Sequence, residues 1–299
     1  MTSDRPLPAS RTKHLSNLLH PLPPPHSDLT LNLRQISSTS NGEGTGTTGT
    51  TLWLSSQILS LYLSSVFGSS SSSNTKPKSS TGEDEKGKGK GKKKVVLELG
   101  SGTGYNSLNI LALGYKVIST DIEPVLSGVL RPNIENNLRV LRNSGLNLEE
   151  GDVYVEELDW MNIASLYDNS QIQIQLRNND QEIGMGMDVP SELDYLKTID
   201  MIIMSDTFYS PTLTFPLWKT LLYISRLTPT SNKPPIIYIS LERRDPTLID
   251  AALDLGREMG FELKKVNRSR LSREMQSSKW GWKGDDWEGV EVWKCRWRG

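Results

Sequence analysis

The sequence predicts an α/β fold in which helices cover both faces of a parallel sheet. Two largely apolar segments, Val95–Leu99 and Thr198–Met204, read as strands buried on both faces. A glycine-rich turn, Gly100–Gly104, joins the first of them to a helical pattern. Strand and helix patterns alternate after it, which is typical of a parallel sheet. We expect one such domain over residues 50–299, after a flexible N-terminal arm over residues 1–49.

Two elements are expected before the glycine turn. Leu29, Leu31 and Leu33 alternate with polar residues, which is the pattern of a short strand. Apolar residues then recur on one helical face between about 53 and 67, and Gly68 ends this helix.

Most later elements end at a glycine or run into a polar turn. Gly114, Gly145 and Gly260 follow three helical patterns, as expected for residues that end helices. The expected elements are, in order, strand 95–99, helix 105–113, strand 115–120, helix 126–142, strand 152–155, strand 198–204, helix 213–227, strand 235–241, helix 246–259, strand 261–266 and strand 290–297. A loop around 280–286 joins the last two strands without a crossover helix, so the last strand can be antiparallel.

Two low-complexity insertions interrupt the domain, at 68–94 and 168–194. The first contains the lysine-glycine run 86–94, which is either a solvated linker or a basic arm for nucleic acid or an acidic partner. No aromatic residue stands among these lysines, so base stacking is absent. Nucleic acid binding is therefore expected only through this run.

The composition excludes several classes of protein. The net charge of −1 selects neither nucleic acid nor membrane. The single cysteine, Cys295, excludes a disulfide framework, and His14, His20 and His26 all lie in the polar N-terminal stretch. A catalytic triad or a histidine-rich metal site in the core is therefore not expected, and we predict no metal. No apolar run approaches the ~20 residues of a membrane span, so we expect a soluble protein of the cytoplasm, with the nucleus as a second location.

The glycine turn has the form of a nucleotide-type pocket at the carboxyl end of a strand. Glycines let the backbone approach a ligand, and the helix start offers unpaired N–H groups. Tyr105 stands where a dinucleotide fingerprint needs its third glycine, and no Gly-Lys-Ser/Thr ending is present. The pattern Glu98-Leu-Gly-Ser-Gly-Thr-Gly104 instead resembles motif I of class I methyltransferases, which use S-adenosylmethionine (SAM).

Asp121 ends the second strand, 17 residues after Gly104. A carboxylate at this place can accept hydrogen bonds from both ribose hydroxyls of a nucleoside. The alternative is an acidic residue that stabilises the dipole of the following helix.

Further motifs resemble one family within this class, the seven-β-strand protein-lysine methyltransferases of family 16. They are Trp53 in an N-terminal motif, Trp160 after the third strand, and Asp206-Thr-Phe-Tyr209 after the fourth. The resemblance covers roughly 50–67, 95–166 and 198–297. It implies a Rossmann-like seven-stranded sheet with an antiparallel last strand, SAM as cofactor, and methyl transfer to a lysine ε-amine of a protein substrate.

The resemblance also implies which residues bind SAM. Trp53 and Trp160 would help to enclose it, since aromatic faces suit both a purine and a sulfonium, although ordinary core packing is the alternative for each. Glu98 would lie near the methionine ammonium, or only end a strand, and Ser205 would act through its backbone. The expected cofactor-binding residues are Trp53, Glu98, Gly100, Ser101, Gly102, Gly104, Asp121, Trp160 and Ser205.

Asp206 and Tyr209 are the expected catalytic residues. Methyl transfer needs a neutral amine held in line about 3 Å from the methyl carbon. Asp206 would hold the incoming lysine and orient its amine, and Tyr209 would line the lysine channel. The alternative is that Asp206 caps the helix near 213 and Tyr209 packs.

Two other functions remain open from the sequence. One is a methyltransferase for RNA or a small molecule, although the Asn-Pro-Pro-Tyr-type motif for base amines is absent after the fourth strand. The other is a SAM-binding scaffold without turnover. The tryptophan-rich end, with Trp293 and Trp297, is expected to pack in the core or to form a substrate-recognition surface. The sequence defines neither the target lysine nor the degree of methylation.

Overall fold

A seven-stranded mixed sheet forms the centre of the computed structural model, which describes residues 5–36, 49–71, 92–179, 189–227 and 233–299. The strands lie in the order β5-β4-β3-β6-β7-β9-β8. Only β9 runs antiparallel to its neighbours, β7 and β8, which confirms the expected last strand. The strands are β3 (Val95–Leu99), β4 (Lys116–Asp121), β5 (Val153–Glu157), β6 (Met201–Ser205), β7 (Ile236–Glu242), β8 (Phe261–Lys265) and β9 (Val290–Trp297).

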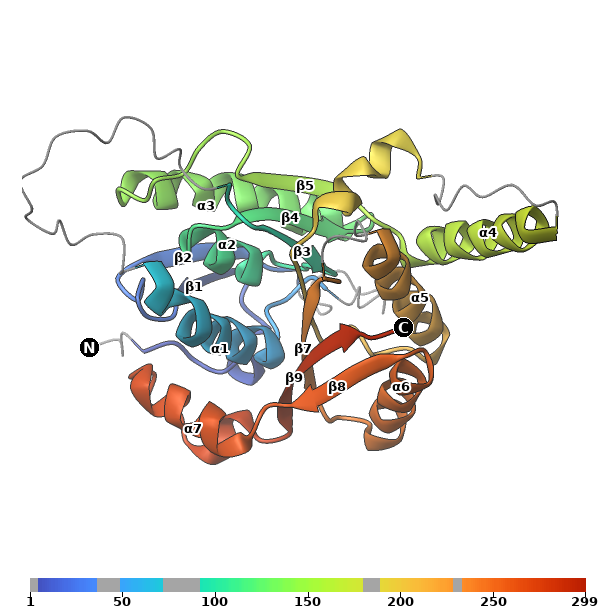
Figure 1. The fold of residues 1–299 in the computed structure, drawn as a ribbon. Coiled ribbons are helices and arrows are strands. Elements are labelled where there is room, and N and C mark those ends of the chain that lie inside the picture. Colours follow the sequence, from blue (N-terminus) through green and yellow to red (C-terminus); the bar gives the residue numbers. More distant parts are fainter. Residues whose placement is uncertain (1–4, 37–48, 72–91, 180–188, 228–232) are drawn as a thin grey trace, which may run out of the picture.

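Helices cover both faces of this sheet (Figure 1). One face carries α1 (Leu54–Ser71), α2 (Tyr105–Ala112), α3 (Arg131–Asn143) and α7 (Arg268–Ser277), and the other carries α4 (Trp160–Asn179), α5 (Pro211–Leu227) and α6 (Pro246–Glu258). Each face has its own apolar cluster, because the central strands send alternate side chains to opposite sides. A π-helical turn, Leu126–Leu130, leads into α3.

The N-terminal residues that the structure describes are folded, so the expectation of a flexible arm over 1–49 is wrong for residues 5–36. They form an antiparallel pair, β1 (Asn17–Pro21) and β2 (Thr30–Arg34). Leu18, Leu31 and Leu33 of this pair are buried against the helical face, which offsets the entropy of ordering the segment. Asn133 and Asn137 of α3 bind the backbone of β2 through their side-chain amides.

His20 is fully buried in β1, which corrects its assignment to a polar stretch. Burial lowers its pKa to about 3, so the ring is neutral. It packs 4.9 Å from the ring of Tyr105, and its Nε2 lies 3.2 Å from Nε2 of Gln57. Its role is therefore core packing.

The expected insertions are also more regular than their composition suggests. Helix α1 extends to Ser71, and α4 continues through the first part of the 168–194 segment, followed by a 3-10 helix over Ser191–Thr198. An ion pair of 2.6 Å between Asp168 and Lys219 ties α4 to α5. The lysine-glycine run lies, up to residue 91, outside the described residues. None of the helices in the described ranges has the length and apolar character needed to span a bilayer.

The tryptophan-rich end packs in the core. Trp280, Trp287 and Trp293 are buried, so the structure favours the packing alternative over a recognition surface. The short helix α7 lies between β8 and β9, where the sequence predicts a loop alone. Its amphipathic face buries Leu271 and Met275.

Candidate functional site: a pocket at the carboxyl ends of β3, β4 and β6

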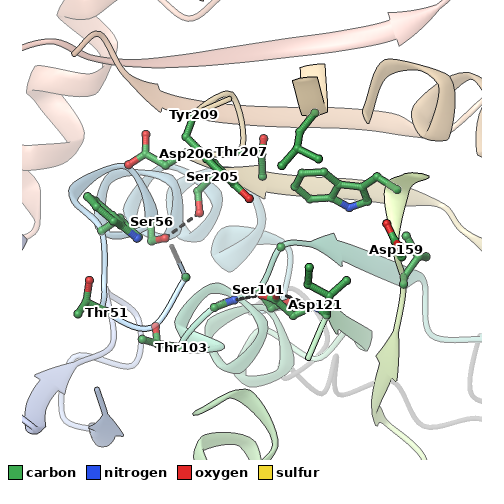
Figure 2. Close-up of a pocket in the computed structure, with 18 of the residues that line it drawn as sticks. Thr51, Ser56, Ser101, Thr103, Asp121, Asp159, Ser205, Asp206, Thr207 and Tyr209 are labelled. Carbon is green, nitrogen blue, oxygen red and sulfur yellow. Dashed lines mark hydrogen bonds between the residues drawn. The ribbon is translucent and has the colours of Figure 1, made fainter. Parts of the chain in front are cut away.

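One pocket opens at the carboxyl edge of the sheet, between the glycine turn and the loop after β6 (Figure 2). It encloses about 860 Å³, its open mouth included. Figure 2 shows Ser101 and Asp121 on one side, and Ser205, Asp206 and Tyr209 on the other. This is the edge at which parallel α/β sheets bind ligands. The lining residues are Gly49, Thr51, Trp53, Ser56, Gly100, Ser101, Gly102, Thr103, Asp121, Ile122, Leu158, Asp159, Trp160, Ser205, Asp206, Thr207, Tyr209, Leu213 and Arg244.

The glycine turn requires its glycines for two reasons. Gly100, Gly102 and Gly104 all have positive φ, at 64°, 54° and 75°. A Cβ on Gly102 would also stand 2.7 Å from the carbonyl oxygen of Gly49. Gly104 is different, because a Cβ there would meet Leu130 and Ile134, and Gly104 does not line the pocket. Gly104 instead allows the turn to pack closely against Leu130 and Ile134 at the start of α3.

Asp121 holds the turn and keeps free capacity for a ligand. Its Oδ2 accepts from the N–H of Gly102 at 2.8 Å, and Oδ1 accepts from the N–H of Ile122 at 2.9 Å. Each carboxylate oxygen has a second lone pair, so both remain able to accept a hydroxyl. Burial raises the pKa of Asp121 to about 6, against the lowering effect of these hydrogen bonds.

Trp160 forms an aromatic wall of the pocket. A Cβ on Gly100 would lie 3.3 Å from both Trp160 and Thr207, so only glycine leaves the ring this close to the turn. Thr207 also lines the pocket, and its hydroxyl oxygen is buried without a hydrogen-bond partner in the described part of the chain. The indole face offers a purine a surface for stacking.

Glu98 lies behind the pocket wall and does not line it, although the sequence places it among the cofactor-binding residues. Its side chain is buried and accepts hydrogen bonds from Ser107 and Asn106. Burial raises its pKa to about 7. Asn106 also donates to Ser205 Oγ at 3.3 Å, so one amide connects Glu98 to the pocket.

Ser205 faces the pocket with its hydroxyl, a contact that the sequence leaves undefined. Its Oγ lies 2.7 Å from Oγ of Ser56, which comes from α1. The end of β6 is thereby fixed to the first turn of α1. Since Trp53 directly precedes that turn, this contact also helps to fix the mouth of the pocket.

Asp206 forms an ion pair instead of capping a helix. Its Oδ2 lies 2.9 Å from Nη2 of Arg244, and its Oδ1 accepts from the N–H of Glu242 at 2.9 Å. Its backbone has a φ of 53°, which is strained for a non-glycine residue and turns the chain sharply after β6. Burial raises the pKa of Asp206, against the attraction of Arg244. Tyr209, 43% exposed, stands at the mouth and is not packed. The alternative in which Asp206 caps the helix near 213 and Tyr209 packs therefore does not describe the structure.

Trp53 completes this corner. The guanidinium of Arg244 lies 4.4 Å from the centroid of its ring, so Arg244 contacts both Trp53 and Asp206. Sequence reasoning missed Arg244 as a site residue. The available signal was its position just after the fifth parallel strand, at the edge where β6 places Asp206.

Of the residues predicted to form the site, the pocket brings together nine: Trp53, Gly100, Ser101, Gly102, Asp121, Trp160, Ser205, Asp206 and Tyr209. Glu98 and Gly104 support it from behind. The expectation of no metal stays a prediction, although no cluster of potential metal ligands occurs among the residues that the structure describes.

Residues 34–178, which include the glycine turn, Asp121 and Trp160, match the family model of methyltransferase family 16, described as lysine methyltransferase. The chain is a SAM-dependent methyltransferase, similar to family 16 over these residues. SAM is therefore its cofactor, and the pocket fits it. Asp121 has acceptors left for a ribose, Trp160 presents an indole face, and the turn admits no side chains.

Solved structures similar to this methyltransferase are distant. Precorrin-6y C5,15-methyltransferase from Geobacter metallireducens is 13% identical, with 69% of this chain and 81% of that chain covered and a TM-score of 0.37. A putative RNA methyltransferase from Pyrococcus horikoshii is 17% identical, covers 81% of each chain and has a TM-score of 0.38. No curated protein sequence matches the chain. Similarities this low carry no information about the substrate.

Proposed function

We propose that this methyltransferase transfers a methyl group from SAM to a lysine ε-amine of a protein substrate. The observation that carries the proposal is the corner formed by Trp53, Tyr209 and the Asp206–Arg244 pair. It combines aromatic rings with a buried carboxylate at an open mouth, which suits a long side chain that ends in an amine. The description of the matching family supports the same substrate.

Each residue at this corner has a separate part in the proposal. SAM supplies an electrophilic methyl group on a sulfonium. Tyr209 lines the path by which the lysine enters. Asp206 holds Arg244 beside Trp53, and the guanidinium charge favours the neutral form of an entering amine. Only a neutral amine has the lone pair that the transfer needs, and the tight corner keeps it aligned.

We propose a protein in the cytoplasm or nucleus as the substrate. The large open mouth and the exposed Tyr209 favour a substrate that presents one side chain from a larger surface. A small molecule or RNA is the second candidate, and a scaffold without turnover is the third. Nothing in the described residues favours the second or the third candidate over a protein substrate, so both are treated as possible outcomes of the experiment.

The experiment is methyl labelling of a lysate. Purified protein is incubated with radiolabelled SAM and lysate from cells that lack it, followed by gel autoradiography and hydrolysis of the labelled bands. Tyr209→Ala is compared with Tyr154→Ala, a matched control, because the two tyrosines are 43% and 42% exposed. We expect a labelled protein band that contains methyl-lysine, about tenfold weaker with Tyr209→Ala and unchanged with Tyr154→Ala.

Other outcomes contradict the proposal in different ways. Label in RNA or in small molecules alone supports the second candidate. If calorimetry detects SAM binding but nothing becomes labelled, the scaffold is correct. An equal loss of methyl label with Tyr209→Ala and Tyr154→Ala would show that Tyr209 has no specific part in the site. Asp206→Asn tests the corner separately, because the amide keeps the shape of the side chain and removes its charge.

A further inference from the structure

A lysine of the chain itself stands at the substrate corner. Nζ of Lys13 lies 3.7 Å from the ring centroid of Trp53, which lines the pocket. Other lysines of the described part of the chain also stand over rings, such as Lys116 over Tyr154, but those rings do not line the pocket. Lys13 therefore contacts a residue that itself lines the pocket.

The segment that carries Lys13 is held by buried hydrogen bonds. The side-chain amide of Gln35, 2% exposed, donates to the carbonyl of Thr12 at 2.9 Å and to that of Leu15 at 2.8 Å, on either side of Lys13. Its oxygen accepts from the N–H of Leu52 at 2.7 Å, next to Trp53. One side chain therefore fixes the backbone around Lys13 against the backbone around Trp53. The contact between Lys13 and the ring is a product of this arrangement.

Burial, with the help of one nearby cation, favours an uncharged amine at Lys13. Its pKa is lowered, first by burial and then by Arg244, while Glu242 and Asp206 act in the opposite direction. No carboxylate of the described residues lies within ion-pair distance of its Nζ. The amine therefore combines a location at the mouth with a larger neutral fraction than an exposed lysine has.

We propose that Lys13 is a self-methylation site, whose ε-amine enters the pocket past Trp53 and accepts the methyl group in cis. The proposal rests on the proposed lysine methyltransferase function. Nζ forms a bond to the methyl carbon while the bond between that carbon and sulfur breaks. The electron pair of the broken bond stays on sulfur, which leaves S-adenosylhomocysteine. The lysine ammonium gives one proton to water before the transfer, and the product is a methylammonium.

The product can return to the place that Lys13 occupies in this structure. A methylated ammonium keeps its positive charge, is less hydrated than the parent amine and binds well to an aromatic face. The side chain is flexible enough to move between the ring and the pocket, since the amine of a lysine is carried on a flexible chain of four carbons. The modified segment is thus expected to remain on Trp53.

The test uses the full-length protein and peptide mass spectrometry. The protein is expressed in cells that lack related enzymes, incubated with SAM bearing a heavy methyl group, and digested. We expect the heavy methyl on the Lys13 peptide at a level about ten times that on the Lys116 peptide. The half-time should stay constant on roughly tenfold dilution, because transfer in cis does not depend on protein concentration. Lys13→Arg should abolish the signal, and Lys116→Arg should leave it unchanged.

A second measurement needs no turnover. The amine of Lys13 is titrated with a limiting acylating reagent across pH in the absence of SAM, and its modification should begin at lower pH than that of a lysine in an unstructured reference peptide. Arg244→Gln should shift this profile to higher pH, which a purely structural role of Arg244 would not do.

The outcomes separate this inference from the proposed function. If lysate proteins acquire methyl-lysine while Lys13 stays unmodified, self-methylation is refuted and the function stands. If nothing is methylated, both fail. Methylation of Lys13 that slows in proportion to dilution would refute the transfer in cis.

Discussion

Replacing Glu98 by glutamine should stabilise the protein at alkaline pH and not at acidic pH. Glu98 is buried, and its carboxylate is held by Asn106 and Ser107. Glutamine keeps an oxygen for Asn106, and the hydroxyl of Ser107 can turn to accept from the new amide. The substitution therefore removes a buried charge with little change of shape.

The magnitude follows from the pKa of Glu98, which burial raises from 4.5 to about 7. A raised carboxyl pKa means that the folded state binds the proton more tightly than the unfolded state. The free energy of unfolding is therefore highest below pH 4.5 and decreases as the pH rises to about 7. The full decrease is about 3 kcal/mol, at 1.36 kcal/mol per pKa unit. Glu98→Gln should gain this amount at pH 8 and less than about 1 kcal/mol at pH 5.

Urea unfolding followed by tryptophan fluorescence at pH 5, 6, 7 and 8 measures this difference. Glu258→Gln, at an exposed position of α6, is the control and should change little at any pH. An equal effect of Glu98→Gln at pH 5 and at pH 8 would falsify the assignment of a buried, partly protonated carboxyl. A loss of stability at pH 8 would show instead that the ionised form is well compensated.

Three other predictions concern the pocket and the core. Gly102→Ala should weaken SAM binding at least about tenfold by calorimetry, whereas Gly114→Ala, which has φ of 88° but open space, should only lower stability by about 1 kcal/mol. SAM affinity should fall as the pH drops through about 6, because protonated Asp121 loses an acceptor for ribose, by up to about tenfold per pH unit. Gly256→Ala should destabilise by about 2 kcal/mol or more in thermal unfolding, because its Cβ would stand 2.4 Å from the buried Trp218.

Each of these predictions has a result that contradicts it. Equal SAM affinity of Gly102→Ala and Gly114→Ala would mean that the turn is not part of the pocket. A SAM affinity that is constant between pH 5 and 7 would exclude Asp121 as a ribose ligand, and Asp121→Asn should remove any dependence that is found. An unchanged melting temperature of Gly256→Ala would mean that Trp218 has room to move.

The central sheet could be predicted from the sequence because its strands are short apolar runs that end at glycines or acids. Val95–Leu99 and the turn after it are local patterns, and so is Asp121 at the end of the next strand. The position of these strands at one edge follows from parallel pairing alone. Nine of the predicted site residues consequently line one pocket.

The rest depends on contacts between distant parts of the chain. Nothing near Asp206 in the sequence indicates that Arg244 neutralises it, because that partner comes from the turn after β7. Residues 168–179 are too polar to predict a helix, and α4 is held there partly by Lys219 of α5. Leu29, Leu31 and Leu33 alternate with polar residues as in a strand. That Leu31 and Leu33 are buried could not be predicted, because it depends on the contact between β2 and α3.

The hairpin β1–β2 belongs to the folded domain but lies almost entirely before the segment that matches the family model. The match to the family model starts at residue 34, the last residue of β2. Trimming the chain there would remove β1 and nearly all of β2, with Leu18, Leu22, Leu31 and Leu33, which are buried. At about 1.5–3 kcal/mol for each buried leucine, the loss equals much of the net stability of a typical domain. A gene fragment chosen by family similarity alone would therefore encode an incomplete core.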